Sequence, residues 1–191
     1  MPMSAVQICN LALARIGILQ GIDDLDEASD EARACALAFD ACLDELLTQH
    51  HWPFVSNRTA ALALVATHVS DDWAYSYRLP SDYLLAGDLG DGIPFQISSD
   101  DSGALLLCNI NPATLTYRAR ITDVALLPHD VAMALAGRLS VEIAQALSRT
   151  DAVVERATRR YERDLALAIA NRLNEPAADC PRAAEAIRAR E

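Results

Sequence analysis

The sequence predicts an α+β protein: an antiparallel-type helical bundle of about four helices, with a small inserted β-meander and an extended C-terminal tail. Apolar residues recur at spacings of three and four near both ends of the chain, which is typical of amphipathic helices. Between them lie short apolar runs separated by Gly, Asp, Ser and Pro clusters. We expect one domain, residues 1–173, with helices at about 4–16, 27–51, 128–148 and 152–172, a β insertion at about 58–121, and a C-terminal arm, 174–191.

The first two helices carry local signals for where they begin and end. Ser4 and Gln7 have the spacing of a capping box, and Gly17 can close the first helix in a left-handed conformation. Pro53 cannot donate a backbone hydrogen bond, so the second helix ends near Trp52, and Trp52 and Phe54 are expected to anchor that turn. The buried stripe of the second helix is expected to comprise Ala28, Ala32, Cys35, Phe39, Cys42 and Leu46.

The last two helices are predicted by the same periodicity. Pro128 suits a first turn, and Asp151 can cap the fourth helix. Two pairs at i,i+4 spacing, Glu155–Arg159 and Arg160–Asp164, are expected on its outer face. The expected core stripes are Val131, Leu135, Leu139, Ile143 and Leu147 in the third helix, and Val154, Tyr161, Leu165 and Ala168 in the fourth.

The β insertion is expected to hold six short strands. The candidate segments are 58–65, 73–79, 83–86, 94–98, 104–108 and 115–121. They are separated by turn-forming clusters rich in Gly, Asp, Ser and Asn.

Composition limits the classes of function. The net charge of −11 argues against a protein that wraps nucleic acid, whose phosphates require a basic surface. All 16 basic residues are arginine, which excludes lysine Schiff bases and P-loop lysines. The five cysteines form no CxxC pair and are interpreted as small core residues of a reducing compartment. No signal peptide and no apolar run long enough to span a membrane is recognised.

The titratable clusters favour structural roles over catalysis, metal binding or cofactor binding. The histidines His50, His51, His68 and His129 lack ligand partners at metal-binding spacing, and a helix C-terminal cap is the favoured role for the first pair. The acidic run 23–31 lacks the residue pattern of a calcium-binding loop. Asp44 and Glu45 are neighbours on one helix, so their side chains diverge and do not form a glycosidase pair. We therefore predict no catalytic residue, no metal site and no cofactor.

One cluster indicates a surface. Arg156, Arg159, Arg160 and Arg163 can form a basic stripe, but acids at Glu155, Glu162 and Asp164 are interleaved with them. This pattern favours a solvated face or a protein interface over a nucleic-acid site.

An ordered set of segments carries a resemblance to a known family. The chain opens with ICNLALARIG at residues 8–17, followed by EARAC at 31–35, DELL at 44–47 and HWPF at 51–54. AYSYRLP at 74–80, YRARITD at 117–123 and the segment 134–144 follow in order. Together they resemble the head-to-tail adaptor family of short-tailed bacteriophages, also called tail tubular protein A or tail accessory factor, over residues 4–170.

The resemblance implies a non-enzymatic virion protein of the tail or neck, made in the bacterial host cytoplasm. Members form a twelvefold ring under the portal protein, extend the DNA channel and dock the next tail or nozzle protein; DNA passes without sequence-specific binding. The resemblance also implies a helical bundle with a β-rich insertion. The free protein is expected to be monomeric. The C-terminal segment would grip the portal, with Ile187, Arg188 and Arg190 as the expected contacts.

Two other classes remain open. Phage tail parts sometimes carry lytic activity, so a tail-associated cell-wall hydrolase is one alternative. A soluble interaction module with no virion role is the other.

Overall fold

A computed structural model of the chain describes residues 2–50, 52, 54, 57–66, 72–90, 92–147 and 150–174. The chain divides into two compact units: Met1–Leu46 with Val124–Glu191, here called the helical unit, and Leu47–Asp123, the β unit. The α+β class and the insertion of the β region between helices are confirmed. Of the predicted C-terminal arm, only Asn174 lies within the described residues.

Helix α1, Ala5–Arg15, begins and ends as its sequence predicts. The Ser4 hydroxyl accepts from the amide of Gln7, and the Gln7 side chain accepts from the amide of Ser4, so the capping box is confirmed. At the other end Gly17 has φ +91°. The Ile18 amide donates to the Leu13 carbonyl and the Gly17 amide to that of Ala14, which is a Schellman closure.

Helix α2, Asp30–Gln49, begins three residues later than the sequence prediction. Ser29 precedes it and accepts a hydrogen bond from the Ala32 amide through its hydroxyl oxygen, so the start is fixed by an N-cap that the periodicity alone did not show. Ala28 consequently lies outside the helix and is exposed. The rest of the predicted stripe is confirmed, because the following side chains are buried: Ala32, Cys35, Phe39, Cys42 and Leu46.

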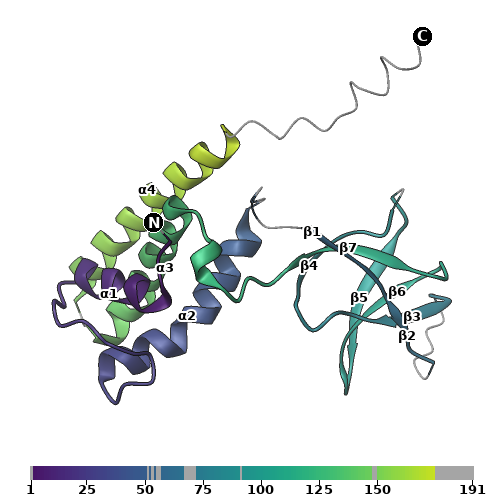
Figure 1. The fold of residues 1–191 in the computed structure, drawn as a ribbon, viewed down its shortest axis with the longest axis horizontal. Coiled ribbons are helices and arrows are strands. Elements are labelled where there is room, and N and C mark those ends of the chain that lie inside the picture. The colour runs from purple at the N-terminus through teal and green to yellow at the C-terminus, as the bar shows by residue number, and fades with distance from the viewer. Residues whose placement is uncertain are drawn as a thin grey trace, which may run out of the picture. The chain divides into compact units, whose positions relative to one another are not determined.

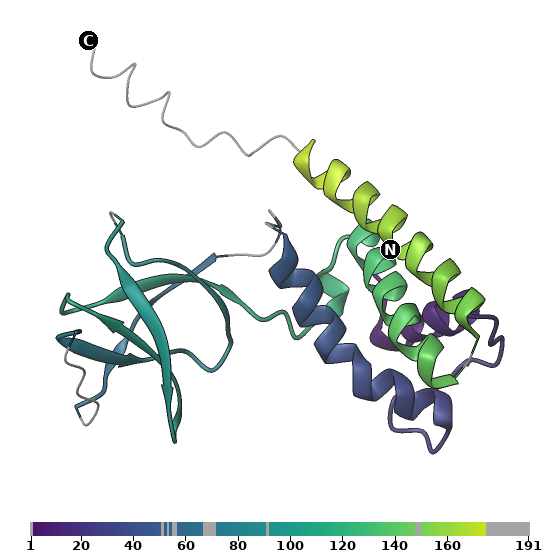
Figure 2. The same cartoon turned by 180° about the vertical axis from the view of Figure 1, so that it is seen from behind.

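Helices α3, His129–Leu147, and α4, Asp151–Leu173, run antiparallel and side by side (Figures 1 and 2). Their axes approach closely at Gly137, where an added Cβ would lie 3.1 Å from the Cα of Tyr161. At one end of the pair, Arg172 holds the Asp130 carboxylate at 3.1 Å. The N-cap of α4 is Thr150, and Asp151 is already helical, so the predicted cap was wrong by one residue.

Seven strands lie among the described residues of the β unit, because the predicted segment 58–65 is split in two. The strands form two antiparallel sheets, with orders β1-β7-β4 and β2-β3-β6-β5, and not the predicted meander. Val124–Leu126 forms a short 3-10 helix, η1, before α3. The strands are β1 Asn57–Ala61, β2 Ala63–Leu64, β3 Tyr75–Arg78, β4 Tyr83–Asp88, β5 Phe95–Asp100, β6 Gly103–Cys108 and β7 Thr114–Ala119.

The two sheets share one core, in which two tyrosine hydroxyls reach polar partners. Tyr77, 1% exposed, donates to the carbonyl oxygen of Ile110 at 2.9 Å. Tyr117 donates to the Asp82 carboxylate at 2.8 Å. Leu106 and Leu115 pack among these rings. The aromatic bodies therefore supply apolar area, while their polar ends remain satisfied.

Candidate functional site

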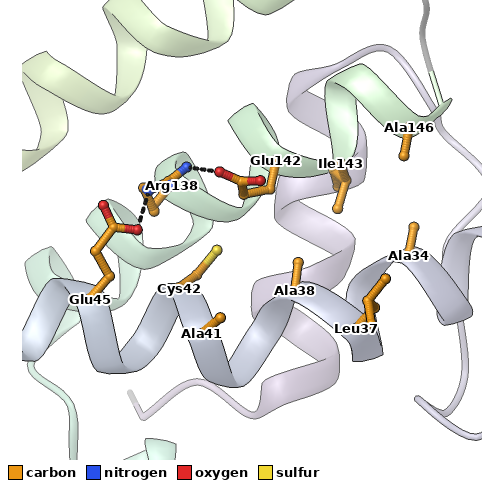
Figure 3. Close-up of a pocket in the computed structure, with 10 residues that line it drawn as sticks. All are labelled: Ala34, Leu37, Ala38, Ala41, Cys42, Glu45, Arg138, Glu142, Ile143 and Ala146. Atoms are coloured by element: carbon orange, nitrogen blue, oxygen red, sulfur yellow. Dashed lines mark hydrogen bonds and ion pairs between the residues drawn. The ribbon is translucent and has the colours of Figure 1, made fainter.

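The helical unit carries a groove between α2 and α3 that encloses about 370 Å³. Four of its ten lining residues are alanines, so helix backbone lies close to its surface at these positions (Figure 3). Leu37 stands beside these alanines with 87% of its surface exposed. The lining residues are Ala34, Leu37, Ala38, Ala41, Cys42, Glu45, Arg138, Glu142, Ile143 and Ala146.

One end of the groove is charged. Arg138 donates through Nε to Glu45 on α2 at 2.8 Å, and its NH1 lies 2.6 Å from Glu142 on its own helix. Burial opposes the charge of this guanidinium, but the two carboxylates outweigh it, and the pKa of Arg138 is raised. Two carboxylates against one guanidinium leave this end of the groove acidic.

Cys42, which lines the groove, is not a nucleophile in this setting. Burial raises the pKa of its thiol to about 11, against a weaker lowering by the charge of Arg138. The thiol is therefore protonated at neutral pH and contributes packing. Cys9, Cys35 and Cys108 are also buried, as expected for core residues, whereas Cys180 lies outside the described residues.

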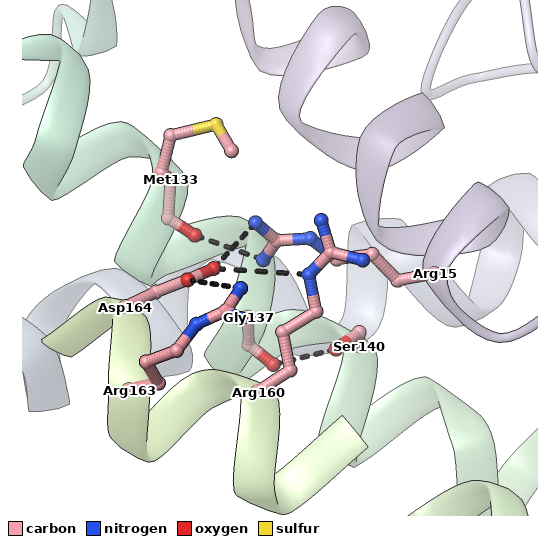
Figure 4. Close-up of polar contacts among 7 residues, drawn as sticks. All are labelled: Arg15, Met133, Gly137, Ser140, Arg160, Arg163 and Asp164. Atoms are coloured by element: carbon pink, nitrogen blue, oxygen red, sulfur yellow. Dashed lines mark hydrogen bonds and ion pairs between the residues drawn. The ribbon is translucent and has the colours of Figure 1, made fainter. Parts of the chain in front are cut away.

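A second polar centre joins α1 to α4 (Figure 4). Arg15 NH2 donates to Asp164 Oδ2 at 2.7 Å, with the two side chains only 1% and 9% exposed. Arg15 NH1 donates to the carbonyl oxygen of Met133 on α3, so one guanidinium ties three helices together. The sequence-based placement of Asp164 on the outer face of α4 was wrong, because Asp164 is turned inward toward a partner far away in sequence.

Two further arginines approach the same carboxylate. Arg160 Nε lies 4.0 Å from Asp164 Oδ2, and Arg163 NH2 lies 3.4 Å from Oδ1. Burial lowers the pKa of Arg15, the charge of Asp164 partly restores it, and Arg160 lowers it again. The Nε of Arg15 is buried with no hydrogen-bond partner among the described residues. Three guanidiniums around one carboxylate give this centre an excess of positive charge.

The end of α2 is capped by a residue that the sequence did not indicate. Arg118 NH1 on β7 donates to the carbonyl oxygens of His50, at 2.8 Å, and Leu47, at 3.3 Å. The arginine thus occupies the capping role that was expected of histidine. The His50 ring instead packs edge-on against Trp52, with centroids 5.7 Å apart.

Trp52, a predicted anchor of the turn after α2, is buried. It is 1% exposed and contacts the ring of Phe54 at 5.8 Å. Pro53, His51 and His68 lie outside the described residues, and His129 is exposed at the start of α3.

The acidic run before α2 is exposed and bonded to its own backbone. Asp24 Oδ1 accepts from the Asp26 amide, and Glu27 Oε2 accepts from that of Asp23. Within the described part of the chain, no group of three or more His, Cys, Asp or Glu side chains is arranged to hold a metal ion. Asp44 and Glu45 follow one another on α2, and Glu45 is held by Arg138. The predicted portal contacts Ile187, Arg188 and Arg190 lie outside the described residues.

No protein-family model and no curated protein matches this sequence. Among the described helices, none is both long and apolar enough to cross a lipid bilayer.

Proposed function

We propose that this chain is a structural head-to-tail adaptor of a short-tailed bacteriophage, which forms a ring under the portal protein and docks the next tail component. The observation that carries the proposal is the arrangement of its elements. A helical unit formed from both ends of the chain, with a β unit inserted between α2 and α3, matches the bundle with a β-rich insertion that the resemblance implies.

The polar groups of the described residues support a structural role. Glu45 and Glu142 are held by Arg138, and the Cys42 thiol has a raised pKa. Asp164 is buried against Arg15. Groups with these partners stabilise helix packing, whereas a catalytic acid, base or nucleophile must be poised to react with a substrate.

The negative charge of the chain is consistent with a wall around a DNA channel. Like charges repel, so an acidic surface lets a duplex slide without binding. In this proposal the C-terminal arm, 174–191, reaches the portal, and the free protein is monomeric at ordinary concentrations.

The test is co-sedimentation with portal rings encoded by the same genome. The full-length chain should migrate with the rings on a glycerol gradient, and a chain lacking residues 174–191 should not, while retaining its thermal midpoint. Failure of the full-length chain to co-migrate contradicts the adaptor function. Cleavage of peptidoglycan by the folded protein in a zymogram would favour the hydrolase. If the protein neither co-migrates with portal rings nor cleaves peptidoglycan, a soluble module with no virion role is favoured.

A further inference from the structure

Helix α4 presents an exposed stripe that its own bundle does not cover. Arg156, Arg160, Arg163 and Leu167 are spaced by four, three and four residues, so they lie on one face of the helix. All four are exposed, and Leu167 keeps 56% of its surface in contact with solvent. We call these four residues the α4 stripe.

The stripe keeps its positive charge because the neighbouring carboxylate is already engaged. Asp164 is bound at 2.7 Å by Arg15, whereas Arg160 and Arg163 approach it only at 4.0 and 3.4 Å and keep 45% and 67% of their side-chain surface exposed (Figure 4). A buried ion pair next to two surface arginines therefore leaves the arginines available to a further anionic group.

The α2–α3 groove has the opposite character. Three of its lining residues on α2 are alanines, Ala34, Ala38 and Ala41, which we call the alanine floor. Their small side chains allow the axis of another helix to approach closely, and Leu37 beside them is almost fully exposed. The carboxylates of Glu45 and Glu142 outnumber the Arg138 guanidinium at one end of the groove. An apolar floor with an acidic end complements a helix that presents arginines and one leucine.

We propose that the α2–α3 groove is covered by the α4 stripe of a second copy of this chain. Leu167 would pack near Leu37 and the alanine floor, and the stripe arginines would face the carboxylates at the acidic end. Of the described residues that line the groove, none belongs to α4, so the two surfaces are different and the contact is heterologous, or head-to-tail. This inference rests on the proposed ring, because repeated heterologous contacts close into rings when the rotation allows.

A second copy is favoured over nucleic acid as the occupant of the stripe. Glu155 and Glu162 are exposed on the same helix, and the chain as a whole is strongly acidic. These negative charges would repel the phosphates of a duplex that approaches the stripe. The acidic end of the groove is small enough to contact the stripe arginines alone.

The experiment is sedimentation velocity of the full chain alone, at low salt and at protein concentrations up to about 1 mM, the range of effective concentration on a shared template. The groove variant is Leu37→Glu. The stripe variant is Arg156→Glu with Leu167→Glu, which leaves the three arginines around Asp164 in place. The matched control carries the same replacements in the β unit, Arg120→Glu with Leu64→Glu, where both side chains are also exposed.

The wild type and the control should show a sedimentation coefficient that rises with concentration and falls back when about 0.5 M salt screens the charges. Each variant should associate at least about tenfold more weakly, because each places a like charge in the contact. A mixture of the groove and stripe variants should form a one-to-one dimer, since one intact groove and one intact stripe remain. Only a head-to-tail contact gives that complementation. Circular dichroism should show unchanged helix content in every variant.

Three results would overturn the inference: a wild type that stays monomeric throughout, variants that associate like the wild type, or a mixture that does not dimerise. Loss of binding to a short DNA duplex in the stripe variant, with self-association intact, would assign the stripe to nucleic acid instead. Because no portal is present, the result is separable from the proposed function. If the chain co-sediments with portal but does not self-associate in this way, the adaptor function is retained and the contact between copies involves other surfaces.

Discussion

The helical unit and the β unit bury different kinds of polar group. In the helical unit, a charged pair, Arg15 and Asp164, is buried, and the apolar core is mostly alanine, leucine and isoleucine. In the β unit, the buried polar atoms include the hydroxyls of Tyr77 and Tyr117, at the ends of large rings. The helical core holds Phe39 as its only buried aromatic residue among those described.

The difference has a physical consequence for sensitivity to change. A buried ion pair is expensive to break on one side, because the remaining charge is left without compensation. A buried neutral hydroxyl can be deleted at the cost of one hydrogen bond, since the ring still fills its space. We therefore expect single substitutions of buried polar groups to destabilise the helical unit more than the β unit. The following changes test that comparison.

The largest effect is expected from Asp164→Asn. This change leaves the Arg15 guanidinium buried beside two further arginines, and it should lower the free energy of unfolding by about 3–5 kcal/mol. Hydrogen exchange should show the loss in the helical unit. The double variant Arg15→Met, Asp164→Leu should recover most of the stability, because neither charge remains. A loss below about 1 kcal/mol in the single variant would show that the pair is not buried as described.

Leu46→Ala should follow, with a loss of about 2–5 kcal/mol in a denaturant series, because the side chain is fully buried on the α2 stripe. Asp40→Ala is the matched control on the exposed face of the same helix and should change stability by less than about 0.5 kcal/mol. Equal losses at the two positions would mean that the wrong face of α2 is buried.

Gly137→Ala tests the close packing of α3 on α4. The new Cβ would lie 3.1 Å from both the Arg15 guanidinium and the Tyr161 Cα, so the helices must separate slightly, and we expect a loss of about 1–3 kcal/mol. The thermal midpoint measures it. A gain in stability, as expected from helix propensity alone, would show that the space between the two helices accommodates the added Cβ.

In the β unit, Tyr77→Phe should cost only about 1 kcal/mol, because the ring keeps its packing and only one hydroxyl proton is lost, which the Ile110 carbonyl and the Asn111 side-chain oxygen share at 2.9 and 3.2 Å. Hydrogen exchange resolved by unit should place this small change in the β unit. A loss as large as that of Asp164→Asn would contradict the contrast between the units.

The smallest effect is a pH dependence from the Arg78–Asp100 pair. The hydrogen bond from Arg78 lowers the pKa of the Asp100 carboxyl to about 2. Since the folded pKa is depressed, the stabilisation is present above the unfolded pKa of about 4 and is lost as pH falls toward 2. Asp100→Asn should flatten this part of the stability profile; an unchanged profile would show that the pair does not contribute.

Local sequence signals predicted the elements but not their long-range partners. The capping box at Ser4, the left-handed Gly17 and the α2 stripe depend on neighbours within a few residues, and each was found where expected, except that Ala28 lies outside α2. The strand order was missed because the two-sheet pairing joins segments far apart in the chain, such as β1 with β7. Turn clusters fix where strands end but not which strands pair.

The buried Arg15–Asp164 pair and the α2–α3 groove were missed for a related reason. Asp164 follows Arg160 by four residues, a spacing typical of a surface pair, and its buried partner Arg15 is 149 residues away. The groove had a weak signal: α2 carries a second apolar row, Ala34, Ala38 and Ala41, beside the buried stripe. With this row, the apolar surface of α2 is wider than a single core-facing stripe, which indicates a second contact face.

Electron cryomicroscopy of portal rings saturated with this protein tests the central claim most directly. The account predicts a continuous ring of copies beneath the portal, with the α4 stripe of each copy, around Leu167, seated in the α2–α3 groove of its neighbour, around Leu37. Bare portal rings at saturating protein, or a bound ring in which both surfaces face solvent, would contradict it.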